Sequence, residues 1–179
     1  ICRLRDIPIL TFINKMDQPG RHPFDLLDEI ERTLGMTAVP FNWPIGEGSG
    51  FQGLYDFQHR QVLFFQRTAH NQRRAPMTVE AFPNPKLAET LGDAYGPLQE
   101  EIGLLTGAGT SFDRDRFLAG ELTPVFFGSA LTNFGVGPFL DAFTKLAPPP
   151  GPRQTAQGLI QPTDEAFSGF VFKIQANMD

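Results

Sequence analysis

The sequence has few of the features that place a protein in a membrane or outside the cell. It contains one cysteine, Cys2, so no disulfide bond can form within the chain, and a reducing compartment is expected. No apolar stretch reaches the roughly 18–20 residues that are needed to cross a bilayer. Arg3, Arg5 and Asp6 interrupt the N-terminal region, where a signal peptide carries its apolar core. We therefore expect a cytoplasmic protein that does not enter a membrane.

An excess of positive charge is also lacking. The formal net charge is −5 and the isoelectric point is about 5.2, which argues against DNA as a partner, because proteins that bind nucleic acids present a basic surface. One local basic cluster is formed by Arg67, His70, Arg73 and Arg74. Two interpretations of this cluster stay open, a contact with the ribosome and a solvated arginine-rich loop.

Residues for metal binding and phosphoryl transfer are missing in the same way. The histidines at positions 22, 59 and 70 do not have the spacing of metal ligands. Asp113, Asp115 and Glu121 are better interpreted as the solvated face of a helix than as a carboxylate site. The phosphate-binding pattern G-x-x-x-x-G-K-[ST] occurs nowhere, and GEGSG at 46–50 predicts only a turn. No catalytic residue and no metal ligand is therefore predicted in this chain.

Hydrophobic residues, by contrast, are plentiful and regularly placed. They make up 41% of the chain and include 18 Phe, which is enough for a folded core. Continuous apolar runs at 7–13 and 122–128 are typical of strands buried on both faces of a parallel sheet. Each run is followed by a segment with helical spacing, at 22–35 and 137–147. The order strand, helix, strand, helix predicts an α/β fold with a partial parallel sheet.

The spacing of these segments predicts the organisation of the chain. Residues 1–39 and 121–147 form two parts of one α/β domain, and residues 40–120 form an α+β insert with a hairpin or meander first and helices afterwards. Residues 148–166 are rich in proline and predict a linker, and residues 167–179 predict the first strand of a β-barrel domain. The sequence begins without Met directly before a strand, so we interpret it as an internal segment of a longer protein.

Polar residues follow both predicted strands, at the edge where parallel sheets bind ligands. Guanine presents two adjacent donors, N1–H and N2–H₂, and the acceptors O6 and N7. The carboxylate of Asp17 can accept from both donors, and the amide of Asn14 can donate to the acceptor edge while it ties the loop together. The N–H of Ala130 can reach O6, and the stem of Lys15 can lie across the ring. Read alone, N-K-x-D is equally compatible with a surface turn, and the second loop is what favours a base site.

These residues resemble the base-specificity loops of translational GTPases, with NKMD at 14–17 and SAL at 129–131. The segments LLDEIERTLG, PFNWPIGEGSGFQGLYD, FLAGELTPVFFGSALTNFGV and FSGFVFKIQANMD are similar to the release-factor type of this family. The resemblance implies a P-loop-type GTPase domain that binds GTP and GDP. It implies guanine contacts by Asn14, Lys15 and Asp17, with a loop that closes over the base, formed by Ser129, Ala130 and Leu131. Mg²⁺ is implied for the parent protein, with its ligands outside this chain.

The resemblance also implies a role in translation termination. The parent protein is expected to be a monomer that hydrolyses GTP on the ribosome and promotes dissociation of class-I release factors. The phosphate-binding loop and the switch regions are expected N-terminal to Ile1, so this segment alone is expected to be inactive as a GTPase. Two alternatives stay open: the same region of an elongation-factor-G-like translocase, and a docking module for the ribosome or a factor that does not bind nucleotide on its own.

Overall fold

The computed structural model describes residue 2 and residues 7–65, 77–109, 111–156, 158–169 and 171–174. The predicted basic cluster of Arg67, His70, Arg73 and Arg74 lies outside the described residues. The chain divides into two compact units, Ile1–Ala147 and Pro148–Asp179.

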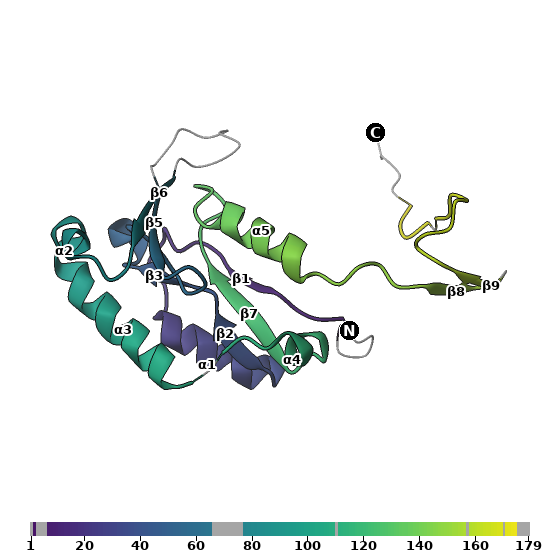
Figure 1. The fold of residues 1–179 in the computed structure, drawn as a ribbon, viewed down its shortest axis with the longest axis horizontal. Coiled ribbons are helices and arrows are strands. Elements are labelled where there is room, and N and C mark those ends of the chain that lie inside the picture. The colour runs from purple at the N-terminus through teal and green to yellow at the C-terminus, as the bar shows by residue number, and fades with distance from the viewer. Residues whose placement is uncertain are drawn as a thin grey trace. The chain divides into compact units, whose positions relative to one another are not determined.

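A parallel sheet forms the centre of the first unit (Figure 1). Its strands are β1 (Thr11–Ile13), β7 (Leu122–Phe127) and β2 (Thr37–Pro40), in the order β1-β7-β2. Both outer strands run parallel to β7, and Ile13 pairs with Phe127 at the carboxyl end. The prediction that the two apolar runs form a parallel sheet is therefore confirmed. Strand β2 was not predicted, because its four residues follow a helix without a distinct apolar run.

Strand β1 is shorter than the predicted range of 7–13, and Pro124 explains why. In this register the N–H of residue 128 donates to the carbonyl of Ile13 at 3.0 Å. The equivalent donor for the carbonyl of Ile9 would be residue 124, and proline has no N–H. The hydroxyl of Thr123 donates to Ile9 instead, at 2.8 Å. The chain thus stays beside β7 over residues 9–11 while the regular ladder begins only at Thr11.

Helices cover both faces of the parallel sheet (Figure 1). Val125 and Phe127 of β7 pack into the hydrophobic cluster that contains Leu27 of α1 (Pro23–Leu34). Phe126 points the other way and packs with Leu146 of α5 (Val136–Leu146). Because successive side chains of a strand alternate between faces, β7 is buried on both sides, as its uninterrupted apolar sequence predicts.

Local sequence signals explain the limits of α1. Pro23 occupies the first turn, where its missing N–H is harmless, and the imidazole Nδ1 of His22 accepts from the N–H of Phe24 at 3.4 Å. Gly35 ends the helix with φ of 64° and donates its N–H to the carbonyl of Glu31. The helix therefore begins and ends where the sequence predicts.

The insert contains an antiparallel meander and a group of helices. The meander has the order β3-β4-β5-β6, with strands Asn42–Ile45, Gly53–Asp56, Gln61–Phe65 and Met77–Ala81. A short 3₁₀ turn, η2 (Gly48–Gly50), lies between β3 and β4. The helices that follow are α2 (Pro85–Leu91), η3 (Gly92–Ala94), α3 (Tyr95–Gly107) and α4 (Arg114–Leu118). The break between α2 and α3 falls at Gly92, whereas Gly96 and Pro97 lie in the first turn of α3, which tolerates proline.

The second unit contains a short hairpin that the sequence did not predict. A two-stranded hairpin, β8 (Arg153–Thr155) with β9 (Gly158–Ile160), lies inside the range predicted as a linker. Within the described residues of 167–179, which are 167–169 and 171–174, no strand is present. The strands were not predicted because they are short and directly follow the proline-rich residues 148–152.

Candidate functional site

Two loops that are distant in sequence meet at the carboxyl ends of β1 and β7. The N–H of Gly128 donates to the carbonyl of Ile13 at 3.0 Å, which continues the ladder past the last strand residue. The N–H of Met16 then donates back to the carbonyl of Gly128, also at 3.0 Å. The loop at 14–17 and the loop at 128–131 are therefore hydrogen-bonded to each other through their backbones, as the predicted strand adjacency requires.

The side chain of Asn14 joins the two loops. Its carbonyl oxygen Oδ1 accepts from the N–H of Lys15 at 2.8 Å and from the N–H of Ala130 at 2.9 Å. An amide has one acceptor oxygen and one donor nitrogen. With Oδ1 used inside the site, Nδ2 is the group that Asn14 can offer to a ligand as a donor. The N–H of Ala130, which the sequence assigns to a ligand oxygen, also serves as part of this internal link.

The rest of the first loop presents charged side chains of both signs. Lys15 is exposed and has φ of 70°, an uncommon conformation for a residue with a side chain. Asp17 is half-buried, and its Oδ2 accepts from the side-chain amide of Gln18 at 3.1 Å. The N–H of Gln18 closes the turn on the carbonyl of Lys15 at 2.9 Å. The loop thus carries a carboxylate and an ammonium group, and its backbone is held by the hydrogen bonds of Met16 and Gln18.

The three predicted residues of the second loop differ in burial. Ser129 is fully buried, and its backbone exchanges two hydrogen bonds of 2.9 Å with Phe134. The Ser129 hydroxyl accepts from the N–H of Thr132 at 3.4 Å, so this side chain shapes the loop. Ala130 and Leu131 are exposed, with 65% of Leu131 accessible. Among these three residues, Ala130 and Leu131 are available to a ligand, and Ser129 supports them.

Three glycines that were not predicted as site residues make this arrangement possible. A Cβ atom on Gly128 would lie 2.4 Å from the carbonyl oxygen of Phe134, and one on Gly135 would lie 2.8 Å from the carbonyl oxygen of Phe127. Gly48, in the insert, donates its N–H to the carbonyl of Met16 at 3.1 Å. A glycine that directly follows a buried strand was the available signal for Gly128. No sequence signal connects Gly48 with a loop about thirty residues earlier.

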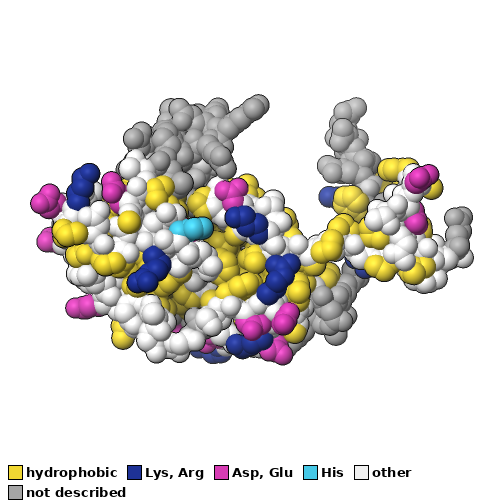
Figure 2. Space-filling view, in the orientation of Figure 1, with side chains coloured by type: hydrophobic (Ala, Val, Ile, Leu, Met, Phe, Trp, Pro, Cys, Tyr) yellow, Lys and Arg dark blue, Asp and Glu magenta, His cyan; other side chains and the backbone are white. Residues whose placement is uncertain are grey.

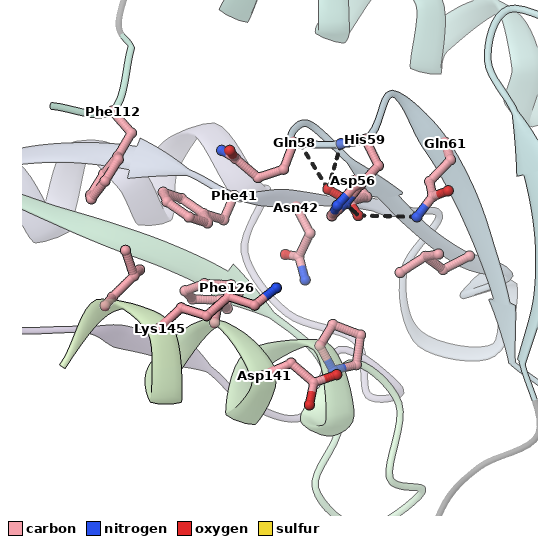
Figure 3. Close-up of a pocket in the computed structure, with 14 residues that line it drawn as sticks. Phe41, Asn42, Asp56, Gln58, His59, Gln61, Phe112, Phe126, Asp141 and Lys145 are labelled. Atoms are coloured by element: carbon pink, nitrogen blue, oxygen red, sulfur yellow. Dashed lines mark hydrogen bonds and ion pairs between the residues drawn. The ribbon is translucent and has the colours of Figure 1, made fainter. Parts of the chain in front are cut away.

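A cavity of about 390 Å³ lies elsewhere in the first unit. On the face of the molecule that Figure 2 shows, the first unit has a hydrophobic hollow with charged side chains around it. In the close-up, Phe41 and Phe126 lie on one side of the cavity, Asp56 and His59 on the meander, and Lys145 on α5 (Figure 3). None of the six predicted ligand residues lines this cavity. It is therefore separate from the loops at 14–17 and 128–131.

The other polar groups behave as structural residues. Asp113 caps α4 by accepting from the N–H of Arg116 at 2.9 Å, and Glu121 accepts from the side chain of the same arginine at 3.3 Å. Within the described part of the chain, no group of three or more His, Cys, Asp or Glu side chains could hold a metal ion. Over the same residues, no helix is long and apolar enough to cross a membrane.

Comparison with known protein families identifies the family of this chain. The model of the elongation factor Tu GTP binding domain matches residues 1–149. The chain belongs to this family. The predicted resemblance to translational GTPases is thereby confirmed, together with the α/β fold that the resemblance implies.

Individual relatives are named more narrowly. The chain is 52% identical to peptide chain release factor 3 of Gloeobacter violaceus, 51% to that of Synechococcus elongatus and 48% to that of Nitrosomonas europaea, each over 100% of this chain. It covers 34%, 32% and 34% of these proteins, so it spans about a third of their length. A solved structure from Thermus thermophilus is 23% identical with a TM-score of 0.52. The match covers 79% of this chain and 22% of that one, and it supports the fold alone.

Proposed function

We propose that this chain is the base-reading half of a guanine-nucleotide site. The observation that carries the proposal is the double hydrogen bond of Asn14 Oδ1, which joins the N-K-x-D loop and the S-A-L loop at 2.8 and 2.9 Å. A surface turn after a strand has no need of a second loop more than a hundred residues later. Membership in the elongation factor Tu GTP-binding family supplies the matching ligand class, GTP and GDP.

In this proposal Asp17 reads the feature that distinguishes guanine from adenine. Its carboxylate accepts from N1–H and N2–H₂ together, a charge-assisted pair that adenine cannot form. Asn14 Nδ2 donates to N7, and the N–H of Ala130 lies beside O6. The alkyl stem of Lys15 covers one face of the ring, and Leu131 covers its edge. Buried Ser129 holds Ala130 and Leu131 in place.

For the parent protein we propose a GTPase that acts in translation termination in the cytoplasm. The support is the name shared by the relatives at 48–52% identity, peptide chain release factor 3. GTP hydrolysis on the ribosome would then promote dissociation of class-I release factors. Mg²⁺ would assist the phosphoryl chemistry in the parent protein. Within this proposal, the loops described here select the nucleotide.

The proposal is tested by exchanging the donor and acceptor pattern of the base. In the full-length gene product, Asp17→Asn should weaken GTP binding at least about tenfold. The same variant should bind xanthosine triphosphate more tightly than the wild type does, because the amide can donate to the O2 carbonyl of xanthine. Calorimetric titration with both nucleotides measures the two effects.

The matched control is Asp28→Asn, which changes a carboxylate of α1 outside the two loops and should leave both affinities unchanged. Equal GTP affinity of Asp17→Asn and the wild type would contradict the base-reading role.

A further inference from the structure

The insert makes direct contact with the first loop, at the centre of the N-K-x-D motif. Met16 is buried between Lys15 and Asp17, with 5% of its surface exposed. Its N–H donates to Gly128 of the parallel domain at 3.0 Å, and its carbonyl accepts from Gly48 of the insert at 3.1 Å. The backbone of this loop is therefore held by the domain on one side and by the insert on the other.

Gly48 also sets the distance between the insert and the loop. It has φ of 57°, and a Cβ atom there would lie 3.3 Å from the nitrogen and 3.4 Å from Cγ of Pro19. Pro19 lies two residues after Asp17 in the chain. A displacement of Pro19 would therefore also move the backbone that carries the Asp17 carboxylate. Gly48 thus forms a hydrogen bond with Met16, directly before Asp17, and packs closely against Pro19, which follows it.

The second loop rests on the insert as well. Phe134, which exchanges two hydrogen bonds with Ser129, lies against two insert rings. The ring centroid of Phe65 in β5 is 5.0 Å away in a stacked arrangement, and that of Phe51 is 5.8 Å away at 41°. Aromatic pairs at these distances have preferred geometries, so they define position as well as adding buried area.

We infer that the insert is a positioning platform for base recognition. Gly48 fixes the position of the N-K-x-D loop, and Phe51 and Phe65 fix the position of the S-A-L loop. This inference rests on the proposed guanine site and assigns to the insert a part in its selectivity. The insert residues touch no base atom; they act through Met16, Pro19 and Phe134. Changes in the insert should therefore alter how strictly the 2-amine of guanine is recognised.

The test compares GDP with inosine diphosphate, which lacks the 2-amine. In the full-length gene product, the wild type should prefer GDP by about ten- to a hundredfold, the range for a hydrogen bond to a charged group. Gly48→Ala should reduce this preference about threefold or more, because small misplacements of a reading group have large effects. Calorimetric titrations with both nucleotides give the ratio, and thermal unfolding is measured in parallel.

The control for backbone conformation is Gly120→Ala. Gly120 also has a positive φ, 72°, and a Cβ atom there would meet nothing within 4 Å. This variant should lose stability but keep the wild-type ratio of the two affinities. If Gly48→Ala does not fold, Gly48→Asn takes its place, because asparagine tolerates a positive φ while it still places a Cβ atom against Pro19.

The second arm of the test uses Phe65→Leu, which removes the stacking contact with Phe134. Its control is Phe57→Leu, just after β4, whose ring contacts Tyr55 at 4.9 Å. Phe65→Leu should lower the preference for GDP, and Phe57→Leu should not.

If the wild type does not distinguish GDP from inosine diphosphate, the proposed function itself fails. If the wild type does, and the Gly48 and Phe65 variants keep its ratio while only their stability falls, the platform inference is overturned.

Discussion

The side chain of Asn42 forms two hydrogen bonds with the backbone of Phe127. Oδ1 accepts from the N–H of Phe127 at 2.7 Å, and Nδ2 donates to its carbonyl at 3.1 Å. Asn42 begins the meander, and Phe127 is the last residue of β7, directly before the loop that starts at Gly128. Asn42 is 3% exposed, so this pair joins the insert to the parallel sheet in the buried interior. The position of the second loop is thereby linked to the insert through β7 as well.

Removing this pair should destabilise the protein strongly. Asn42→Ala leaves a buried N–H and a buried carbonyl without their partner, and each orphaned group costs about 1–3 kcal/mol. We expect the free energy of unfolding to fall by about 2–4 kcal/mol, measured by urea denaturation of the 179-residue chain. Asn84→Ala removes only the cap of α2 and should cost about 1 kcal/mol. Similar losses for the two variants would contradict a special role of Asn42.

Asn14 should show two separable roles. Asn14→Asp keeps an oxygen that accepts from Lys15 and Ala130 but removes the amide donor, whereas Asn14→Ala removes both functions. Both variants of the full-length gene product should bind GDP more weakly than the wild type. Only Asn14→Ala should also release the link between the loops, which hydrogen exchange at the N–H of Ala130 would detect. Equal protection of this N–H in both variants would show that the loops do not depend on Oδ1.

How far the sequence predicts this structure depends on the distance over which each signal acts. Apolar runs and helix caps are local, so the pairing of β1 with β7 and the limits of α1 follow from the printed residues. The short length of β1 depends on Pro124 in the neighbouring strand β7. The effect of Pro124 on Ile9 can be recognised only once the register of the two strands is known. The contact between Gly48 and Met16 joins two turns, each of which has an ordinary local sequence. Such contacts between loops require the three-dimensional structure.

Trp43 provides an optical probe of the insert. It is the only tryptophan of the chain, it is fully buried, and its Nε1–H donates to Glu101 Oε2 at 2.7 Å. Glu101→Ala leaves this donor without a partner and should lower the free energy of unfolding by about 1–3 kcal/mol. Tryptophan fluorescence during urea unfolding measures both the loss and the change in the folded-state emission. Glu100→Ala, an exposed neighbour on α3, should match the wild type; an equal loss there would indicate a general effect on the helix.

Tyr55 should make stability depend on pH in alkaline solution. Burial raises the pKa of Tyr55 above its ordinary value of 10.0; the hydrogen bond and charge of Arg60 act against the rise, and the charge of Asp56 adds to it. Below the ordinary pKa the phenol is protonated in the folded and unfolded states alike. Above it the unfolded state loses the proton more easily, so stability falls as the pH rises through the folded pKa. Urea unfolding at increasing pH should show a smaller fall for Tyr55→Phe; an identical fall in both proteins would exclude Tyr55 as the cause.

The 179-residue chain alone should bind GDP weakly. In the proposed site its loops contact the base, but its sequence lacks the phosphate-binding pattern G-x-x-x-x-G-K-[ST], and phosphate contacts contribute much of the affinity in nucleotide sites of this kind. We expect a dissociation constant above about 0.1 mM by calorimetry, where the full-length gene product binds much more tightly. Guanosine should then bind the isolated chain about as well as GDP does, because both present the same base. Micromolar binding of GDP together with much weaker binding of guanosine would mean that this chain itself holds phosphate groups.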